Sequence, residues 1–436
     1  MLKQLYKTLV SKNNAIEKKS HTRIIRHQSH SISKNKISSH ALDVALSLQE
    51  AGYDAYIVGG AVRDLLLKKK PKDFDIATNA TPEQIKAHFK RARIIGRRFR
   101  IVHVRCGREI IEVTTFRGNH DTTFKSKSSI INTKGMLIRD NVYGTLHDDA
   151  LRRDFTINAL YFNAQDLTII DHLNAIEDLK KRKLKIIGNP INRYKEDPVR
   201  MLRAIRLNIK LGFSIDNDTA KPIKDLSPLI KQVSNARLYD EVLKLFLHGY
   251  GKDTFVSLRK FNIFKQLFPQ TEEILKKNTD QSKKYMLLIT NSLSNTDDRI
   301  KKNKPITPAF LFAVLLWPVL DSFKKELNNK NFKKNILFKD EIQNIINEQL
   351  KTVAIPKRFI PSMKDIWYLQ KKLENFSTKK SLQTINHPRF RAAYDFFILR
   401  SGIDINLKEK SSHWTDLQKN SPKKYPKNNR VIYEQS

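Results

Sequence analysis

The segment of residues 56–75, YIVGGAVRDLLLKKKPKDFD, constrains the fold of this chain more than any other. Its pattern predicts an apolar strand that ends in Gly59-Gly60, a short helix that carries Arg63, and a second strand that holds Asp73 and Asp75. Side chains alternate along a strand, so the two aspartates share one face. Paired carboxylates repel each other unless a cation neutralises them, and a glycine turn lets backbone amides approach a phosphate. The segment therefore predicts a nucleotide triphosphate site with bound Mg²⁺.

Two further segments carry charged residues that could belong to the same site. The segment REIIEVTTF has the alternation of a strand, with Glu112 in its middle. Glu112 either lies on a solvated face or joins the aspartate pair as a third metal ligand, and both interpretations stay open. Further along, LRRDFTINALYF places Asp154 directly after Arg152 and Arg153. Arginines in this position could hold the phosphates of a triphosphate.

The pattern of the chain changes near residue 190. Strand and helix signals mix before this point, and beyond it the pattern is almost wholly helical, so we expect an α+β fold. The expected parts are a disordered basic arm at 1–36, a head with a mixed sheet and helices at 37–190, a helical neck at 191–255, a helical body at 256–404 and a basic tail at 405–436. Helices are predicted in these later parts at 222–250, 254–268, 308–327, 339–353, 362–374 and 388–402.

The first helix beyond residue 190 carries a regular arginine pattern. In RYKEDPVRMLRAIRLNIKLGF, Asp197 can cap the helix, with a proline at its first position. Arg200, Arg203 and Arg206 recur every third residue along one side. Asp197 and Arg200 stand one turn apart, so an acceptor and a donor can present together to a nucleobase edge. An ordinary amphipathic helix with a solvated arginine face explains the spacing equally well.

The charge and the single cysteine narrow the partners and the compartment. Lys and Arg total 82 against 44 Asp and Glu, a net charge of +38, which favours nucleic acid or an anionic membrane surface. Cys106 is the only cysteine, so an intramolecular disulfide is impossible and a reducing, cytoplasmic compartment fits. The longest apolar run, at 308–320, is too short to span a bilayer, and we expect no integral membrane association. Walker A, H-E-x-x-H and G-x-S-x-G motifs are absent.

Taken together, several motifs resemble one known family. GGAVRD with DFD, then RRDFTINAL, then EDPVRMLRAIR, resemble the successive motifs of the class II tRNA nucleotidyltransferase and bacterial poly(A) polymerase family, over about residues 50–215. IIGRRFRIVHV, TTFRG, TPAFLFAVLLW, AIPKR and HPRFRAAYDF resemble the poly(A) polymerase branch and extend the likeness to about residues 38–402. The resemblance implies a nucleotidyltransferase head with a helical neck, body and tail, ATP as substrate and Mg²⁺ as cofactor.

The resemblance also implies roles for individual residues. Asp73 and Asp75 hold Mg²⁺, and Asp154 completes the acidic set of the active site. Asp197 and Arg200 form a protein template for the incoming base. Glu112 is our own addition as a metal ligand and competes with Asp154 for the third carboxylate position. The residues implied at the nucleotide are Gly59, Gly60, Arg63, Arg152, Arg153, Asn158, Asp197, Arg200, Arg203 and Arg206.

The expected activity is that of a template-independent poly(A) polymerase. It adds AMP from ATP to RNA 3′ ends, releases pyrophosphate and tags transcripts for decay, with RNA-decay proteins as partners and a monomeric state. A CCA-adding tRNA nucleotidyltransferase is the alternative, because it shares every head motif. A non-catalytic RNA-binding protein is a further alternative. The chain departs from its relatives at Leu207 and Asn208, and its tail is short and lysine-based.

Overall fold

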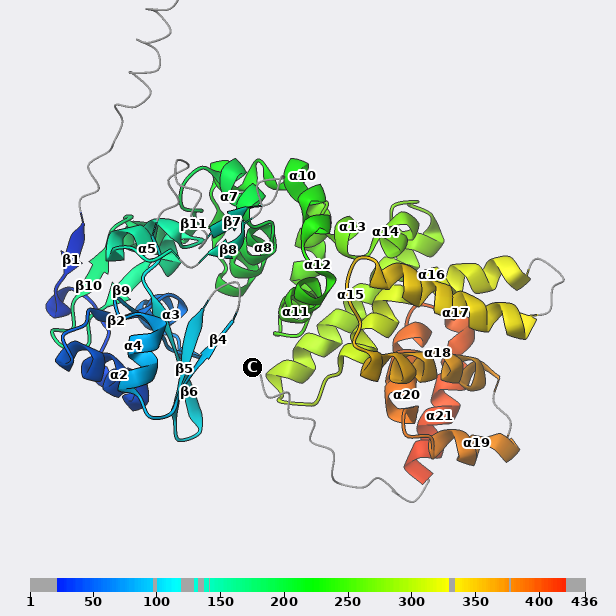
Figure 1. Ribbon diagram of the computed structural model, residues 1–436. Coiled ribbons are helices and arrows are strands. Elements are labelled where there is room, and N and C mark those ends of the chain that lie inside the picture. The colour runs from blue at the N-terminus through cyan, green and yellow to red at the C-terminus, as the bar shows by residue number, and fades with distance from the viewer. Residues whose placement is uncertain are drawn as a thin grey trace, which may run out of the picture. The chain divides into compact units, whose positions relative to one another are not determined.

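The computed structural model describes residues 22–96, 100–118, 129–131, 137–140, 142–328, 334–375 and 378–420. The chain divides into two compact units. Unit 1 comprises Met1–Arg200 and Gly212–Pro222, and unit 2 comprises Met201–Leu211 and Ile223–Ser436. Unit 1 holds the large β-sheet, whereas the described part of unit 2 is helical (Figure 1). Over the described residues, we find no helix with the length and apolarity needed to cross a membrane.

An eight-stranded mixed sheet organises unit 1, in the order β1-β10-β9-β2-β3-β6-β5-β4. Strands β3 and β6 pair in parallel, and the other neighbours pair antiparallel. The strands are β1 (Arg23–Ile25), β2 (Ala55–Val58), β3 (Asp75–Thr78), β4 (Ala92–Ile95), β5 (Ile101–Cys106), β6 (Glu109–Thr115), β9 (Leu160–Phe162) and β10 (Ile169–Asp171). Two small sheets pair β7 (Ser129–Ile131) with β8 (Leu137–Asp140) and β11 (Lys183–Leu184) with β12 (Ser214–Ile215). The mixed sheet confirms the predicted α+β class.

Unit 1 also contains short helices, and α2, α3 and α4 pack on its large sheet. The helices are α2 (Ser39–Glu50), α3 (Gly60–Leu66), α4 (Pro82–His88), α5 (Leu146–Arg152), α6 (Ala175–Lys180), α7 (Pro190–Glu196) and α9 (Asn217–Ala220). The predicted cap of α4 is confirmed, because Thr81 and Gln84 form a capping box before Pro82. On the sheet face that carries Val58 and Tyr161, the cover is α5, whose Ala150 joins their apolar cluster.

The prediction of a disordered arm over residues 1–36 is wrong for residues 22–36. Strand β1 adds to the edge of the sheet by pairing with β10, with Arg23 opposite Asp171. Ile32 is buried, and the His30 ring donates from Nε2 to the Leu167 carbonyl (2.8 Å) and accepts from the Ile32 amide (3.2 Å). Strand pairing, the buried Ile32 and the hydrogen bonds of His30 therefore anchor a segment that is otherwise basic and polar. Residues 1–21 lie outside the described residues.

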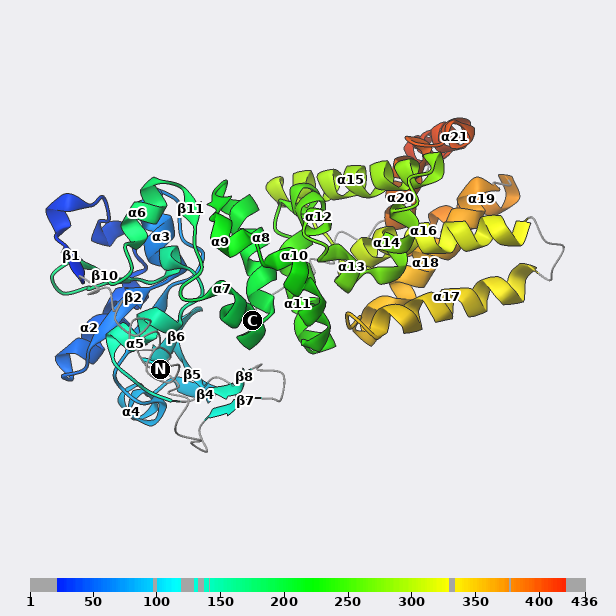
Figure 2. The same ribbon diagram turned by 90° about the horizontal axis from the view of Figure 1, so that it is seen from above.

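Unit 2 is a succession of helices. They are α8 (Val199–Leu211), α10 (Ile223–Leu226), α11 (Asn235–Phe246), α12 (Gly251–Lys260), α13 (Phe264–Leu267), α14 (Pro269–Leu275), α15 (Asp280–Lys301), α16 (Pro308–Asn328), α17 (Lys334–Leu350), α18 (Ile360–Glu374), α19 (Thr378–Ile385), α20 (Phe390–Ser401) and α21 (Lys408–Asn420). Helix α8 starts on the last two residues of the first segment of unit 1 and continues into unit 2. Helices α16 and α17 lie side by side in both ribbon views (Figures 1 and 2). Helix α16 contains the apolar run with Pro318 in its interior, as the sequence predicts for a core helix.

Four described helices of unit 2, α14, α15, α19 and α21, lie outside the ranges predicted as helical. The sequence analysis predicts no helix at α15, although this helix has 22 residues, because half of its buried positions are filled by polar residues. The prediction of a basic tail from residue 405 is wrong for residues 405–420, which form a 3₁₀ turn and α21. Trp414 on α21 is 1% exposed, and its indole N–H donates to the Leu373 carbonyl (3.0 Å). One large buried side chain thus holds this segment on the core. Residues 421–436 lie outside the described residues.

Candidate active site

The turn between β2 and α3 is a point where several predicted site residues converge. Gly59 adopts φ +77°, a conformation that favours glycine, and forms the N-cap of α3. A Cβ atom on Gly59 would lie 3.6 Å from Nη1 of Arg153 and 4.0 Å from Oδ2 of Asp75. The backbone of this turn therefore borders both a predicted phosphate-binding arginine and a predicted metal ligand.

The aspartate pair stands at the start of β3. Asp73 is exposed, Phe74 is buried and Asp75 is half-buried. The strand begins at Asp75, however, and Asp73 precedes it rather than lying within it. Glu112 on β6 is the direct register partner of Asp75 in the parallel pair β3–β6. Glu112 and Asp75 therefore point to the same face of the sheet from neighbouring strands.

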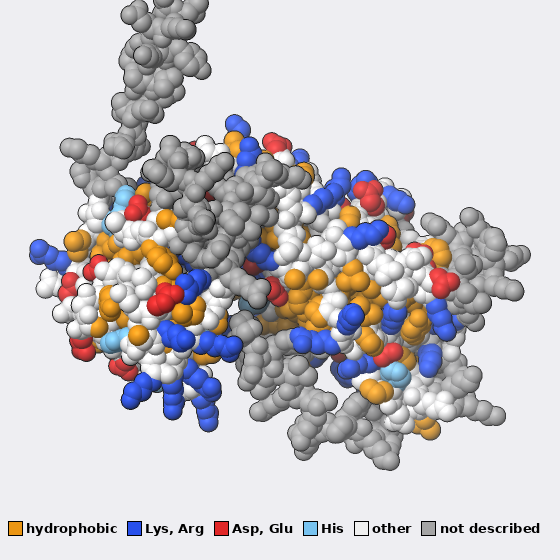
Figure 3. All heavy atoms as spheres, in the orientation of Figure 1, with side chains coloured by type: hydrophobic (Ala, Val, Ile, Leu, Met, Phe, Trp, Pro, Cys, Tyr) orange, Lys and Arg blue, Asp and Glu red, His pale blue; other side chains and the backbone are white. Residues whose placement is uncertain are grey.

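A row of charged residues continues from Asp75 across the sheet. Glu112 pairs in register with His103 on β5, and His103 pairs with Arg93 on β4. The Nε2 atom of His103 lies 3.4 Å from Oε1 of Glu112. Figure 3 shows Lys and Arg side chains gathered at the end of the β5–β6 hairpin, where Arg105 is exposed. A polyanion that approaches this face thus meets cations at the rim and carboxylates further in.

A buried triad that the sequence analysis did not predict holds Arg153 in place. The Oδ2 atom of Asp149 accepts from Nε (3.0 Å) and Nη2 (2.9 Å) of Arg153 and from the Tyr161 hydroxyl (2.7 Å). Asp149 is 6% exposed, and its Oδ1 accepts from the Arg117 amide (3.2 Å). Burial opposes the charge of Arg153, but Asp149 and Tyr161 together raise the pKa of its guanidinium. The i, i+4 spacing of Asp149 and Arg153 on a helix was the sequence signal for this pair.

Arg63 and Asn158 belong to a second buried network beside the glycine turn. The Arg63 guanidinium donates to Oδ1 of Asp64 from Nε (2.8 Å) and to the Asn158 side-chain oxygen from Nη1 (2.6 Å). Asn158 in turn donates from Nδ2 to Oδ1 of Asp154 (3.0 Å), which also accepts from the Phe155 amide (2.8 Å). Arg63 is 4% exposed. In this structure Arg63 orients Asn158, and Asn158 orients Asp154.

The predicted base-reading residues follow α7. The Oδ1 atom of Asp197 accepts from the Val199 amide (3.2 Å) at the start of α8, which agrees with its predicted capping position. Nη1 of Arg200 donates to Oε2 of Glu196 (2.8 Å) and to the Arg193 carbonyl (2.7 Å). Asp197 and Arg200 thus stand together at the end of the first segment of unit 1. Arg203 and Arg206 are half-buried on the part of α8 that belongs to unit 2.

The acidic residues of unit 1 fit a Mg²⁺ site in which the protein supplies some of the ligands and the substrate supplies the others. Over the described residues, no group of three or more His, Cys, Asp or Glu side chains could hold a metal ion by itself. Mg²⁺ is usually bound in proteins by one or two carboxylates together with substrate phosphates rather than by an all-protein cage. Asp75 and Glu112, on one face of neighbouring strands, and Asp73, two residues before the start of β3, offer carboxylate oxygens for such an arrangement.

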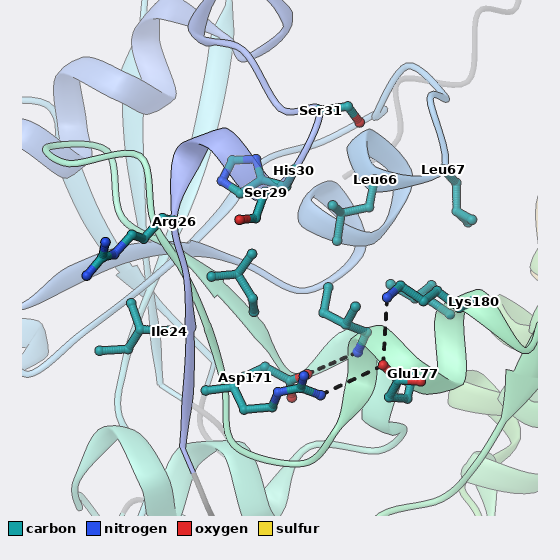
Figure 4. A pocket seen from close by; sticks show the side chains of 14 residues that line it. Ile24, Arg26, Ser29, His30, Ser31, Leu66, Leu67, Asp171, Glu177 and Lys180 are labelled. Atoms are coloured by element: carbon teal, nitrogen blue, oxygen red, sulfur yellow. Dashed lines mark hydrogen bonds and ion pairs between the residues drawn. The ribbon is translucent and has the colours of Figure 1, made fainter.

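A separate pocket of about 870 Å³ lies elsewhere in unit 1, between the N-terminal segment, the end of α3 and α6. Figure 4 shows Ile24 and Arg26 on one side of this pocket and Leu66 on the other. Glu177 on α6 lies 3.7 Å from Lys180 at its rim. None of the predicted site residues lines this pocket, so it is distinct from the candidate active site.

Comparison with known proteins agrees with these observations. Three family models match: the poly A polymerase head domain at residues 55–185, a probable RNA- and SrmB-binding site of polymerase A at 212–275, and the polymerase A arginine-rich C-terminus at 332–434. Poly(A) polymerase I of Salmonella typhimurium (strain LT2) is 42% identical over 406 residues, which are 92% of this chain and 87% of that protein.

Similarity to CCA-adding enzymes is more limited. The CCA-adding enzyme of Lactobacillus helveticus is 37% identical over 220 residues, or 49% of this chain and 51% of that protein. The crystal structure of the Bacillus stearothermophilus CCA-adding enzyme in complex with CTP matches with a TM-score of 0.58 and 23% identity, and the match covers 86% of this chain and 82% of that one. This second likeness shows the shared fold. The family resemblance of the motifs is confirmed, and the chain belongs to the bacterial poly(A) polymerase I family.

Proposed function

We propose that this chain is a template-independent poly(A) polymerase, which adds AMP from ATP to RNA 3′ ends and releases pyrophosphate. The observation that carries this conclusion is the extent of the similarity. The likeness to poly(A) polymerase I runs over nearly the whole chain, including the C-terminal part, whereas the sequence likeness to the CCA-adding enzyme covers only about half of it.

The carboxylates of the sheet supply the metal-binding end of the proposed site. Asp73 and Asp75 would hold Mg²⁺ at the start of β3, and Glu112, the register partner of Asp75, would join them from the neighbouring strand. When bound, Mg²⁺ stabilises charge on the phosphates and favours ionisation of the attacking 3′-hydroxyl. The Asn158 amide holds the Asp154 carboxylate in position at this side of the site. In the proposed reaction the 3′-oxygen forms a bond to the α-phosphorus of ATP as the bond to the pyrophosphate oxygen breaks.

Positive groups and the base reader complete the proposed site. Arg153 lies beside the Gly59 turn, so both can contact the triphosphate, and Gly60, Arg63 and Arg152 support that contact. Asp197 accepts and Arg200 donates at the edge of the incoming adenine. Arg203 and Arg206 support this reader from α8.

The experiment that tests the proposal measures nucleotide choice. Purified protein with Mg²⁺ should extend an unstructured RNA with ATP and should use CTP poorly. Asp75→Asn should lower the rate by at least about 100-fold, because a preorganised charge at the reacting phosphate is lost. Asp43→Asn is a matched control, since Asp43 is exposed on α2. CTP incorporation that stops after a fixed number of additions to tRNA would instead identify a CCA-adding enzyme. RNA binding without any nucleotide addition would leave only the non-catalytic alternative.

The composition of the chain also bears on its cellular setting. The lone Cys106 fits a reducing cytoplasm, and the net charge of +38 fits an RNA substrate. We place the chain there as a monomer that tags transcripts for decay together with RNA-decay proteins. Size-exclusion chromatography with light scattering and co-purification with tagged protein test the monomeric state and the partners.

A further inference from the structure

The guanidinium of Arg193 on α7 contacts several groups around the candidate site. Its Nη2 atom donates to the backbone carbonyls of Arg152 (2.5 Å) and Arg153 (2.7 Å). Its Nη1 atom donates to Oε2 of Glu196 (2.7 Å). The Arg193 side chain is 11% exposed, so these contacts are largely shielded from solvent. A single guanidinium thus joins two backbone carbonyls to one carboxylate.

The two carbonyls belong to the C-terminal end of α5. That helix ends at Arg152, with Arg153 as its C-cap, and the last carbonyls of a helix have no partner within the helix. A cation at this end also complements the negative end of the helix dipole. Arg193 therefore fixes the backbone from which the Arg152 and Arg153 side chains project. Arg153 is the residue that borders the glycine turn.

The carboxylate that Arg193 contacts, Glu196, also contacts Arg200 of the base reader. Oε2 of Glu196 accepts from both Arg193 and Nη1 of Arg200, and that same Nη1 also donates to the Arg193 carbonyl (2.7 Å). Arg200 is thereby held by the main chain of Arg193 and by the same carboxylate oxygen. All of these residues belong to unit 1, which ends its first segment at Arg200.

We infer that Arg193 is a positioning residue that couples the triphosphate-binding arginines at the end of α5 to the base-reading Arg200. The inference rests on the proposed function, because it takes Arg153 as a triphosphate ligand and Arg200 as part of the adenine reader. Arg193 touches neither ATP nor RNA. It sets the distance between Arg153, which holds the phosphates, and Arg200, which selects the base. It therefore determines how much better adenine than another base aligns the α-phosphate for attack.

The geometry requires arginine at this position. A planar guanidinium can donate at once to two carbonyls and a carboxylate, whereas a lysine ammonium is a point charge on a flexible stem. Burial and the neighbouring Arg200 lower the pKa of Arg193 to about 10, so the side chain still carries its charge at neutral pH. Arg193→Lys keeps the charge and loses the forked contact, which makes it the informative substitution.

The test compares nucleotide selection in Arg193→Lys and in the parent protein. The ratio of kcat/KM for ATP to kcat/KM for CTP should fall by about tenfold, the size expected when a charged hydrogen bond is lost. The main effect on ATP should be on kcat, because the base and phosphate contacts remain and only their alignment changes. An unchanged ratio in a folded Arg193→Lys protein would overturn the inference.

A double-mutant cycle separates coupling from a general loss of stability. In an Arg200→Ala background, Arg193→Lys should change the ratio by less than about twofold, because the reader through which it acts is gone. An undiminished tenfold effect in that background contradicts the coupling. Arg259→Lys is the matched control. Arg259 also forms a bidentate pair with a glutamate, Glu272 (2.7 and 2.8 Å), in unit 2, so its substitution should lower the melting temperature and leave the ratio unchanged.

Two further outcomes keep the inference separable from the proposed function. If the parent protein itself adds no AMP, the proposed function fails and the ratio has no meaning. If Arg193→Lys does not fold by circular dichroism, Glu196→Gln takes its place, because the Glu196 side chain is 37% exposed and its loss leaves α5 capped. Glu196→Gln should lower the ratio by about threefold or more as the link to Arg200 weakens. A parent-like ratio in this variant would refute the coupling.

Discussion

At the scale of single residues, Gly59 combines two constraints. Its φ of +77° is one that other residues adopt only with strain, and its missing side chain leaves room beside Arg153 and Asp75. Gly52 shares the positive φ, at +85°, but a Cβ atom there would meet nothing within 4 Å. The two glycines therefore separate the effect of backbone strain from the effect of a methyl group in contact with Arg153 and Asp75.

Substitution of these glycines should have different consequences. Gly59→Ala and Gly52→Ala should each lower the free energy of unfolding by about 2 kcal/mol, because both force alanine into a sparsely populated conformation. Only Gly59→Ala should also lower kcat/KM for ATP, since its methyl group enters the space beside Arg153 and Asp75. Urea denaturation and steady-state kinetics measure the two effects. Equal activity losses in both variants would contradict the proposed place of Gly59 at the triphosphate.

The buried triad offers a second prediction at this scale. Asp149→Ala leaves Arg153 and the Tyr161 hydroxyl without their shared acceptor, so it should lower the free energy of unfolding by about 3 kcal/mol. Asp43→Ala is the control, because Asp43 is exposed and its loss should change stability by less than about 0.5 kcal/mol. Chemical denaturation of both proteins measures the difference. Similar stabilities would show that Arg153 does not depend on this contact.

The third carboxylate can be assigned by its effect on the magnesium requirement. Glu112 is the register partner of Asp75, whereas Asp154 is held by Asn158 and the Phe155 amide. Glu112→Gln should raise the Mg²⁺ concentration for half-maximal rate by about tenfold, because one charged ligand is lost. Asp154→Asn should lower kcat with little change in that concentration. The reverse result would assign the metal contact to Asp154.

At the scale of elements, the N-terminal segment of residues 22–36 depends on neutral histidines. Nδ1 of His30 accepts from the Ile32 amide, and Nδ1 of His172 lies 3.0 Å from the Thr22 hydroxyl. Burial lowers the pKa of both rings below the usual 6.5, with His27 and His147 adding to the effect. Both rings therefore have a lower pKa in the folded protein than in the unfolded chain. Their neutral forms stabilise the segment fully above about pH 6.5, and this stabilisation is lost as the pH falls through the pKa values of the folded protein.

The segment should therefore detach on acidification before the rest of the sheet. Amide hydrogen exchange should show lower protection in residues 23–32 at pH 5 than at pH 7.5, after correction for the intrinsic rates, while strand β6 keeps its protection. A His30→Gln and His172→Gln double variant cannot titrate at these positions and should lose most of this pH dependence. Equal protection at both pH values would contradict the role of the two rings.

At the scale of the whole molecule, the basic charge should govern RNA binding. A net charge of +38 favours a substrate whose phosphates release counterions on binding. The dissociation constant for an unstructured RNA should rise by about twentyfold between 50 and 200 mM salt if about three phosphates are neutralised. The KM for ATP at saturating RNA should change by about twofold or less. Fluorescence anisotropy and steady-state kinetics measure the two quantities, and a salt-independent dissociation constant would contradict an electrostatic RNA surface.

The sequence by itself determined the class of chemistry and the order of the parts. The glycine turn and the cap at Asp197 are local patterns, and local geometry is enough to read them. The apolar run of α16 was equally readable as a core helix. The helix α15 was not, because several of its buried positions hold serine, threonine or aspartate and the apolar pattern does not stand out.

Only the tertiary structure decided which distant residues meet. Asp75 and Glu112 became neighbours through the parallel pairing of β3 and β6, and Arg63 reached Asn158 across 95 positions of sequence. Arg193 joined the end of α5 to the start of α8 in the same way. Such contacts depend on strand order and helix packing, which are set by burial across the whole unit rather than by any local pattern. For the same reason a few buried side chains, such as Trp414, ordered a segment that its composition marked as a tail.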